Sequence, residues 1–214
     1  MRIALLGAEC TGKTQLAAAL MRALNDPPGR AVVVPEWLRS WCAEHARTPQ
    51  CHEQRAIAQH QASLIAHTPD RGYLLADTTP LMTALYSDLL FQDPTLYPFA
   101  LEHQRQYDLT LVMGLDLPWV ADGIQRDGPA ARARVDARLR QVLDTEALPY
   151  CMVYGTGTAR TTCALQAIER LRGVTSTSTY QRASNWQWSC EKCSDAVCEH
   201  QLFSTLLKAD SVRR

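Results

Sequence analysis

The sequence predicts an α/β fold built on a parallel five-stranded sheet flanked by helices. Five short runs of almost continuously apolar residues recur along the chain, and polar stretches with helical periodicity separate them. Strands that are apolar on both faces are typical of parallel sheets, and their alternation with helices produces right-handed crossovers that cover both faces. The runs comprise residues 2–6, 31–34, 73–76, 109–113 and 150–154.

Two of the intervening stretches carry the pattern of a helix with one buried face. Residues 15–24 have apolar side chains at positions 16, 17, 20, 21 and 24, a spacing of three to four residues. Residues 132–143 place Val135, Leu139 and Leu143 on one side and arginines elsewhere. We therefore expect a helix directly after the first strand and another one before the fifth.

Polar residues and glycines follow the predicted strands. They are Gly7, Glu36, Asp77, Asp116 and Gly155. In open α/β sheets, ligands bind in the crevice beyond the carboxyl ends of the strands. We therefore expect the functional site at this edge of the sheet.

The composition excludes several classes of function. The 214 residues include 22 Lys and Arg against 22 Asp and Glu, so the formal net charge is zero. Coating nucleic acid or an anionic membrane requires a net positive field, so neither is an expected partner. The chain has no run of 18 apolar residues, and its N-terminus lacks the pattern of a signal peptide. These features predict a cytoplasmic protein.

A phosphate-binding loop follows the first predicted strand. Residues 7–14 read GAECTGKT and match the pattern G-x-x-x-x-G-K-[ST] between a strand and a helix. The glycines let backbone N–H groups point at a phosphate, and the helix adds its positive N-terminal dipole. Lys13 would reach the β- and γ-phosphates of ATP, and the Thr14 hydroxyl would bind Mg²⁺. The sequence thus predicts a P-loop NTPase with the ATP-binding residues Gly7, Ala8, Glu9, Cys10, Thr11, Gly12, Lys13 and Thr14.

Further catalytic candidates lie at the ends of the second and third strands. Asp77 has the position of a carboxylate that holds Mg²⁺, and Glu36 could deprotonate or bind an acceptor hydroxyl. Either one could be the base, and each could instead be a solvated or helix-capping carboxylate. Arg39, one helical turn beyond Glu36, could pair with it or face a phosphate. Because no lysine lies in the N-K-x-D motif of regulatory GTPases, a small kinase or small NTPase is favoured.

An arginine-rich stretch after the fourth strand is a candidate lid. In phosphoryl transfer a mobile arginine-bearing segment closes over the phosphate, excludes water and neutralises developing charge. Arg126 is the preferred catalytic arginine because it precedes the predicted helix that contains Arg132, Arg134 and Arg138. For most of these arginines the alternative is a solvated helix face with Arg–Asp pairs.

Four segments together resemble, in order and spacing, the kinase domain of NadR-type proteins, the P-loop ribosylnicotinamide kinases, and their AAA_28 relatives. The segments read GAECTGKT, VPEWLR, LLADTTPLMTALYSDLLF and YDLTLVMGLDLPWVADGIQRDG, and the resemblance covers about residues 1–170. It implies a thymidylate-kinase-like sheet. It also implies ATP-dependent phosphorylation of a nucleoside-like molecule. That molecule would be nicotinamide riboside, phosphorylated on its 5′-hydroxyl group in NAD salvage.

The resemblance also implies roles for individual residues. It assigns the phosphate loop to the binding of ATP and Mg²⁺. It assigns Glu36 and Asp77 to the chemistry of the acceptor and the metal. It places Trp119 and Asp122 on the nucleoside side or in the lid, and the ring of Trp119 or Tyr86 could stack on a cationic pyridinium. NadR proteins carry an adenylyltransferase domain before the kinase, which we do not expect here because the loop begins at residue 7. Together with Arg39, the candidate substrate-binding residues are Glu36, Tyr86, Trp119 and Asp122.

A short extension, residues 173–214, follows the predicted kinase domain of residues 1–172. It contains CEKCSDAVCEH, in which Cys190, Cys193, Cys198 and His200 could close a tetrahedral structural zinc site like a zinc knuckle. Free thiols, a redox C-x-x-C pair and a site shared with another subunit are the alternatives. The extension could mediate homo-oligomer formation or bind a protein partner. The second functional hypothesis is therefore a nucleotide-switched regulatory or assembly ATPase that uses this tail.

Overall fold

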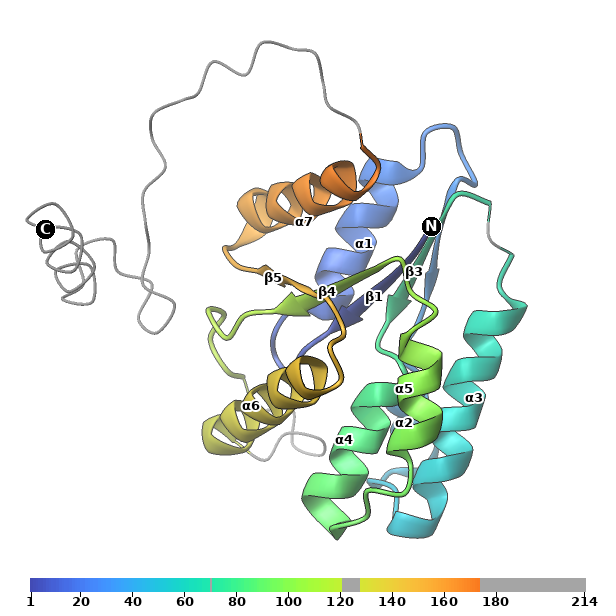
Figure 1. Ribbon diagram of the computed structural model, residues 1–214, viewed down its shortest axis with the longest axis vertical. Coiled ribbons are helices and arrows are strands. Elements are labelled where there is room, and N and C mark those ends of the chain that lie inside the picture. Colours follow the sequence, from blue (N-terminus) through green and yellow to red (C-terminus); the bar gives the residue numbers. More distant parts are fainter. Residues whose placement is uncertain (70, 121–127, 174–214) are drawn as a thin grey trace, which may run out of the picture. The chain divides into compact units, whose positions relative to one another are not determined.

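The computed structural model describes residues 1–69, 71–120 and 128–173, and within them five strands form one parallel sheet (Figure 1). The strands lie in the order β2-β3-β1-β4-β5, and every neighbouring pair is parallel. The predicted fold class is thus confirmed. The strands are β1 (Arg2–Leu6), β2 (Ala31–Val34), β3 (Tyr73–Asp77), β4 (Leu109–Met113) and β5 (Cys151–Val153).

Helices cover both faces of this sheet. Helices α1 and α7 pack together on one face, and α3, α4, α5 and α6 cover the other (Figure 1). The two helices predicted from periodicity are present as α1 and α6, and both are longer than predicted. In the described part of the chain the helices are α1 (Lys13–Leu24), α2 (Trp37–His45), α3 (Gln54–His67), α4 (Pro80–Phe91), α5 (Tyr97–Gln104), α6 (Pro129–Thr145) and α7 (Gly157–Leu171), with a 3₁₀ turn (Cys51–Glu53) before α3.

The central strand explains why these runs read as apolar. Alternate side chains of a strand point to opposite faces of the sheet. Ile3 and Leu5 of β1 accordingly pack against α1 and α7, whereas Ala4 and Leu6 pack into the core beneath α4 and α6. All five residues of β3 and of β4 are buried as well. Helices cover both faces of the sheet, so its strand ends are left open. Polar side chains gather at the carboxyl ends.

Several sequence predictions fall outside the described residues. They are the roles of Asp122 and Arg126 and the zinc site of Cys190, Cys193, Cys198 and His200. The domain boundary at residue 172 also stays a prediction. No helix in the described ranges is both long enough and apolar enough to cross a membrane.

Candidate active site

Glycine is required at two positions of the loop between β1 and α1. Gly7 has φ 147° and Gly12 has φ 75°, which is backbone geometry that other residues rarely adopt. A Cβ atom on Gly7 would lie 3.0 Å from Cβ of Met113, and one on Gly12 would lie 2.8 Å from Cδ1 of Leu117. The loop is therefore shaped by close packing against β4 and the segment that follows it.

Lys13 is the first residue of α1 and folds back over the loop. Its Nζ donates hydrogen bonds to the carbonyl oxygens of Gly7 at 2.7 Å and Ala8 at 2.9 Å. Burial lowers the pKa of Lys13 from its ordinary value, and the nearby carboxylates of Glu36 and Asp77 partly oppose that shift. A buried ammonium group at the mouth of a phosphate loop is placed to meet the negative charge of a bound phosphate.

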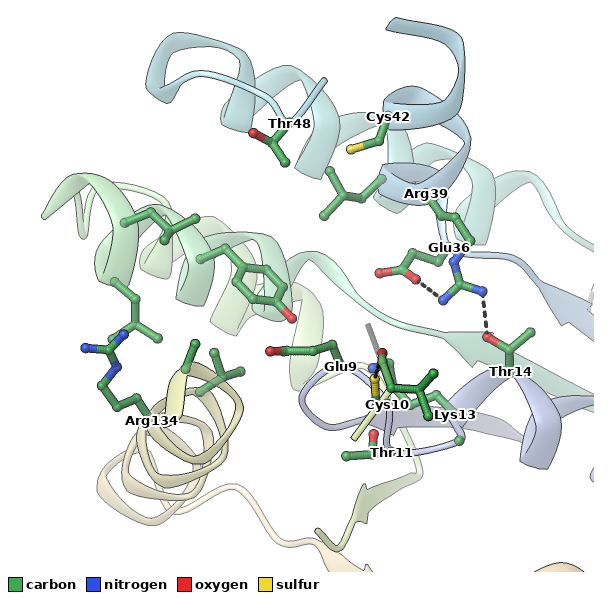
Figure 2. Close-up of a pocket in the computed structure, with 18 of the residues that line it drawn as sticks. Glu9, Cys10, Thr11, Lys13, Thr14, Glu36, Arg39, Cys42, Thr48 and Arg134 are labelled. Carbon is green, nitrogen blue, oxygen red and sulfur yellow. Dashed lines mark hydrogen bonds and ion pairs between the residues drawn. The ribbon is translucent and has the colours of Figure 1, made fainter. Parts of the chain in front are cut away.

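A hydrogen-bonded chain beside Lys13 runs from Asp77 through Thr14 and Arg39 to Glu36. The Thr14 hydroxyl donates to Oδ2 of Asp77 at 2.6 Å. It also accepts from Nη1 of Arg39 at 3.2 Å (Figure 2). Arg39 also pairs with Oε2 of Glu36 at 2.9 Å. Glu36 and Asp77, the residues predicted at the ends of the second and third strands, therefore belong to one group of hydrogen-bonded side chains.

The donor set in this chain fits a magnesium ion. Asp77 is 2% exposed, and its Oδ1 has no hydrogen-bond partner among the described residues. One carboxylate oxygen is thus free next to a hydroxyl group, and oxygen donors of these two kinds are the ligands that Mg²⁺ prefers. Thr14 and Asp77 are the residues that would hold the ion.

A cavity of about 680 Å³ opens over the phosphate loop. The loop forms its floor, and α2, α4 and α6 contribute its walls (Figure 2). Charged side chains line the end near the loop, namely Glu9, Lys13, Glu36 and Arg39, while Arg134 contributes from α6. Much of the remaining wall is apolar, with Leu38, Cys42, Pro49, Leu89, Leu90 and Val135. A volume of this size matches that of small-molecule sites.

A family assignment agrees with this geometry. The family model of AAA_28, described as an AAA domain, matches residues 2–160 of the chain. The chain belongs to the AAA_28 family. No curated protein sequence matches it.

Solved structures show the same fold as this AAA_28 domain. A NadR protein in complex with NR matches with a TM-score of 0.67 at 20% identity, over 81% of this chain and 52% of that chain. A thymidylate kinase from Candida albicans matches with a TM-score of 0.59 at 16% identity, over 80% and 91% of the two chains. A deoxyadenosine kinase from M. mycoides gives 0.55 at 12%, over 79% and 100%. The predicted thymidylate-kinase-like fold is therefore confirmed, and the chain spans about half the length of the NadR protein.

The cavity of the AAA_28 domain brings together nine of the thirteen predicted site residues that the structure describes. Asp77 lies behind Thr14 and is not among the residues that line the cavity. Gly7, Ala8 and Trp119 also lie outside the lining, although Leu117 and Pro118 belong to it. The Nε1 atom of Trp119 is instead buried, without a hydrogen-bond partner in the described part of the chain. The predicted residues in the lining are Glu9, Cys10, Thr11, Gly12, Lys13, Thr14, Glu36, Arg39 and Tyr86.

Two residues of the AAA_28 domain were missed by sequence reasoning. Gln54 lines the cavity and is 2% exposed, and its Oε1 lacks a hydrogen-bond partner among residues that the structure describes. Arg160 of α7 is 5% exposed and donates to a carbonyl oxygen of the phosphate loop. Neither residue stands in a recognisable motif, so no local signal could have found them.

The described residues of the AAA_28 domain contain no cluster of three or more His, Cys, Asp or Glu side chains that could hold a metal ion by themselves. A magnesium ion held by one hydroxyl and one carboxylate would take its other ligands from phosphate and water. The predicted zinc ligands lie outside the described ranges.

Proposed function

We propose that the chain is an ATP-dependent kinase that phosphorylates a hydroxyl group of a nucleoside-like small molecule. The observation that carries this proposal is the shared cavity. A phosphate loop, a magnesium-type donor pair and a cavity-lining carboxylate meet at one end of a space large enough for a nucleoside. The rest of that space is largely apolar, as a heterocyclic base requires. The fold of nucleoside and nucleotide kinases supports the same reading.

The residues divide the work of phosphoryl transfer between binding and electrostatics. The backbone N–H groups of the loop and Lys13 would hold the β- and γ-phosphates, and Thr14 and Asp77 would hold Mg²⁺. When bound, Mg²⁺ neutralises charge on the phosphate oxygens. Lys13 exchanges its contacts with the carbonyl oxygens of Gly7 and Ala8 for phosphate oxygens. Positioning of this kind supplies most of the rate enhancement in phosphoryl transfer.

Burial favours Glu36 over Asp77 as the residue that orients the acceptor. Asp77 is 2% exposed, does not line the cavity and uses Oδ2 to accept from Thr14. Glu36 lines the cavity, and its side chain is 14% exposed. Glu36 can therefore reach a hydroxyl group in the cavity and accept its proton, with Arg39 holding the carboxylate in place. Asp77 serves the metal.

The first acceptor to test is nicotinamide riboside, phosphorylated on its 5′-hydroxyl group. The likeness in fold to the NadR protein in complex with NR supports this choice. Tyr86 also brings an aromatic surface to the cavity, on which a cationic ring could stack. A carboxamide of the base would find a neutral polar partner in Gln54.

The test is Mg·ATP turnover with and without a panel of nucleosides headed by nicotinamide riboside. We expect one nucleoside to stimulate ADP formation in stoichiometry with its own phosphorylation, which mass spectrometry confirms. Lys13→Ala should abolish the stimulation, and Glu36→Gln should lower kcat while ATP binding persists. Arg105→Gln is the control, because Arg105 is a surface residue paired with Glu146 far along the chain from the loop.

The opposite outcome would be equally clear. ATP turnover that no nucleoside stimulates, with tight ATP binding retained, would refute the nucleoside-kinase proposal. It would favour instead a nucleotide-switched regulatory or assembly ATPase.

A further inference from the structure

Arg160 is a buried cation in the first turns of α7 that contacts three separate loops. Its Nη2 donates to the carbonyl oxygen of Thr11 at 2.7 Å, in the loop after β1. Its Nη1 donates to the carbonyl oxygen of Gly155 at 2.8 Å, after β5, and to Oδ1 of Asp116 at 3.1 Å, after β4. Asp116 in turn accepts through Oδ2 from the backbone N–H of Gly155. One side chain thus joins the ends of three strands.

The contact with Thr11 acts directly on the phosphate loop. A trans peptide is planar, so its C=O and N–H groups point in opposite directions. By holding the carbonyl oxygen of Thr11 toward α7, Arg160 turns the N–H of Gly12 away from α7. The side chain of Thr11 is fixed too, because its Oγ1 donates to the carbonyl oxygen of Ala8 at 2.7 Å. The orientation of a phosphate-binding amide is therefore set by a residue from the far end of the domain.

The guanidinium group of Arg160 forms an ion pair with Asp116 and has little access to water. Arg160 is 5% exposed, and the side chain of Asp116 is 21% exposed. Hydrogen bonds to a charged donor at such a site are stronger than neutral ones. They hold the loop in one shape before a ligand arrives, and a loop ordered in advance does not lose that entropy on binding.

We propose that Arg160 is a positioning residue for the nucleoside triphosphate, which preorganises the phosphate loop and ties it to the turn at residues 155–157. This assignment rests on the proposed kinase function and deepens it. Arg160 is not among the residues that line the acceptor cavity. Because its contact is with the carbonyl oxygen of Thr11 in the phosphate loop, we expect its effect on ATP affinity, with acceptor affinity unchanged.

The first test compares the parent chain with Arg160→Lys. Lysine keeps a positive charge beside Asp116, but one ammonium group cannot reach all three acceptors. The dissociation constant of the non-hydrolysable analogue AMP-PNP is measured by calorimetry in the presence of Mg²⁺ and without an acceptor, well below the midpoint of thermal unfolding. We expect it to rise about 10- to 100-fold, the value of one or two charge-assisted hydrogen bonds. KM for ATP should rise in parallel, with KM for the acceptor unchanged.

A second variant separates positioning from the cost of an unpaired buried charge. The double variant Arg160→Gln with Asp116→Asn removes both charges at once, so no carboxylate is left without its partner. We expect this double variant to lose as much AMP-PNP affinity as Arg160→Lys. If Arg160 had a merely structural role, the double variant would instead have a lower unfolding midpoint and an unchanged AMP-PNP affinity.

Arg138→Lys is the matched control. Arg138 is a partly buried arginine whose Nε and Nη2 donate to Oδ2 of Asp88 at 3.0 and 2.8 Å, and it does not line the cavity. Its AMP-PNP affinity should equal that of the parent. An AMP-PNP affinity of Arg160→Lys within twofold of the parent, or an equal loss of affinity in Arg138→Lys, would overturn the assignment of Arg160. Neither result would affect the proposed function. A parent chain that binds no AMP-PNP would refute the proposed function together with that assignment.

Discussion

Replacing Asp77 by Asn should separate the stability of the domain from its activity. In the parent, Oδ2 of Asp77 accepts the Thr14 hydroxyl at 2.6 Å, while Oδ1 is buried and unpartnered in the described residues. An amide keeps the shape and still accepts from Thr14, so the hydrogen bond loses about 1 kcal/mol of charge assistance. The NH2 group of that amide takes the buried, unpartnered position of Oδ1, so one unsatisfied polar group replaces another, and Lys13 loses a nearby carboxylate. The free energy of unfolding should therefore fall by only about 1–2 kcal/mol.

The activity of Asp77→Asn should fall much further. A neutral amide is a poor ligand for Mg²⁺, so we expect kcat to drop about 10²- to 10³-fold, similar to the loss of one electrostatic group in other active sites. Urea unfolding gives the stability, and Mg²⁺ titration of ATP turnover gives the metal dependence. Asp108→Asn is the control, because Asp108 binds the backbone N–H of Arg2 at the other end of the sheet. Full activity, or an unfolding free energy lowered by more than about 3 kcal/mol, would refute this reasoning.

Three further predictions concern single residues. Burial lowers the pKa of His103 to about 4, so the unfolded chain takes up the proton first, and stability should fall by about 2 kcal/mol between pH 7 and pH 5. Urea midpoints measure this loss, and His103→Phe should remove it. Gln54→Leu should raise KM for the acceptor about three- to tenfold with KM for ATP unchanged, as loss of one neutral hydrogen bond requires; equal changes in both constants would contradict a base contact. Cys10 lies in the phosphate loop and lines the cavity, so iodoacetamide should inactivate the protein and ATP should slow that inactivation. The variant Cys10→Ser should resist iodoacetamide. Inactivation of Cys10→Ser at the parent rate would place the reactive thiol elsewhere.

The strands and the phosphate loop could be predicted because their signals are local. A five-residue apolar run marks a strand that is buried on both faces, and residues 7–14 form a contiguous motif. The strand order and the side on which each helix packs depend on crossovers, for which the chain carries no short-range pattern. The same limit applies to Gln54 and Arg160, which join the site through tertiary contacts alone.

Side-chain direction and burial account for the remaining differences. The sequence left open whether Glu36 or Asp77 acts as the base, and our proposal of Glu36 rests on exposure, cavity lining and the Thr14 contact, which no sequence pattern encodes. The resemblance assigned Trp119 to the nucleoside side or the lid. An irregular loop has no fixed period, so its sequence does not reveal which side chains turn inward, and Trp119 lies outside the lining.

The contact between Arg160 and Thr11 joins residues that are 149 positions apart. On the ribosome the phosphate loop is therefore made almost at once, whereas the side chain that sets its shape arrives about 7 to 30 s later at ordinary rates of translation. Strand β1 also lacks its neighbours at first, because β3 and β4, with which it pairs, begin only at Tyr73 and Leu109. Until those strands have been made, an apolar strand stays unpaired, and surface of this kind makes a nascent chain prone to aggregation. By the role proposed for Arg160, tight nucleotide binding is confined to chains in which α7 has been synthesised.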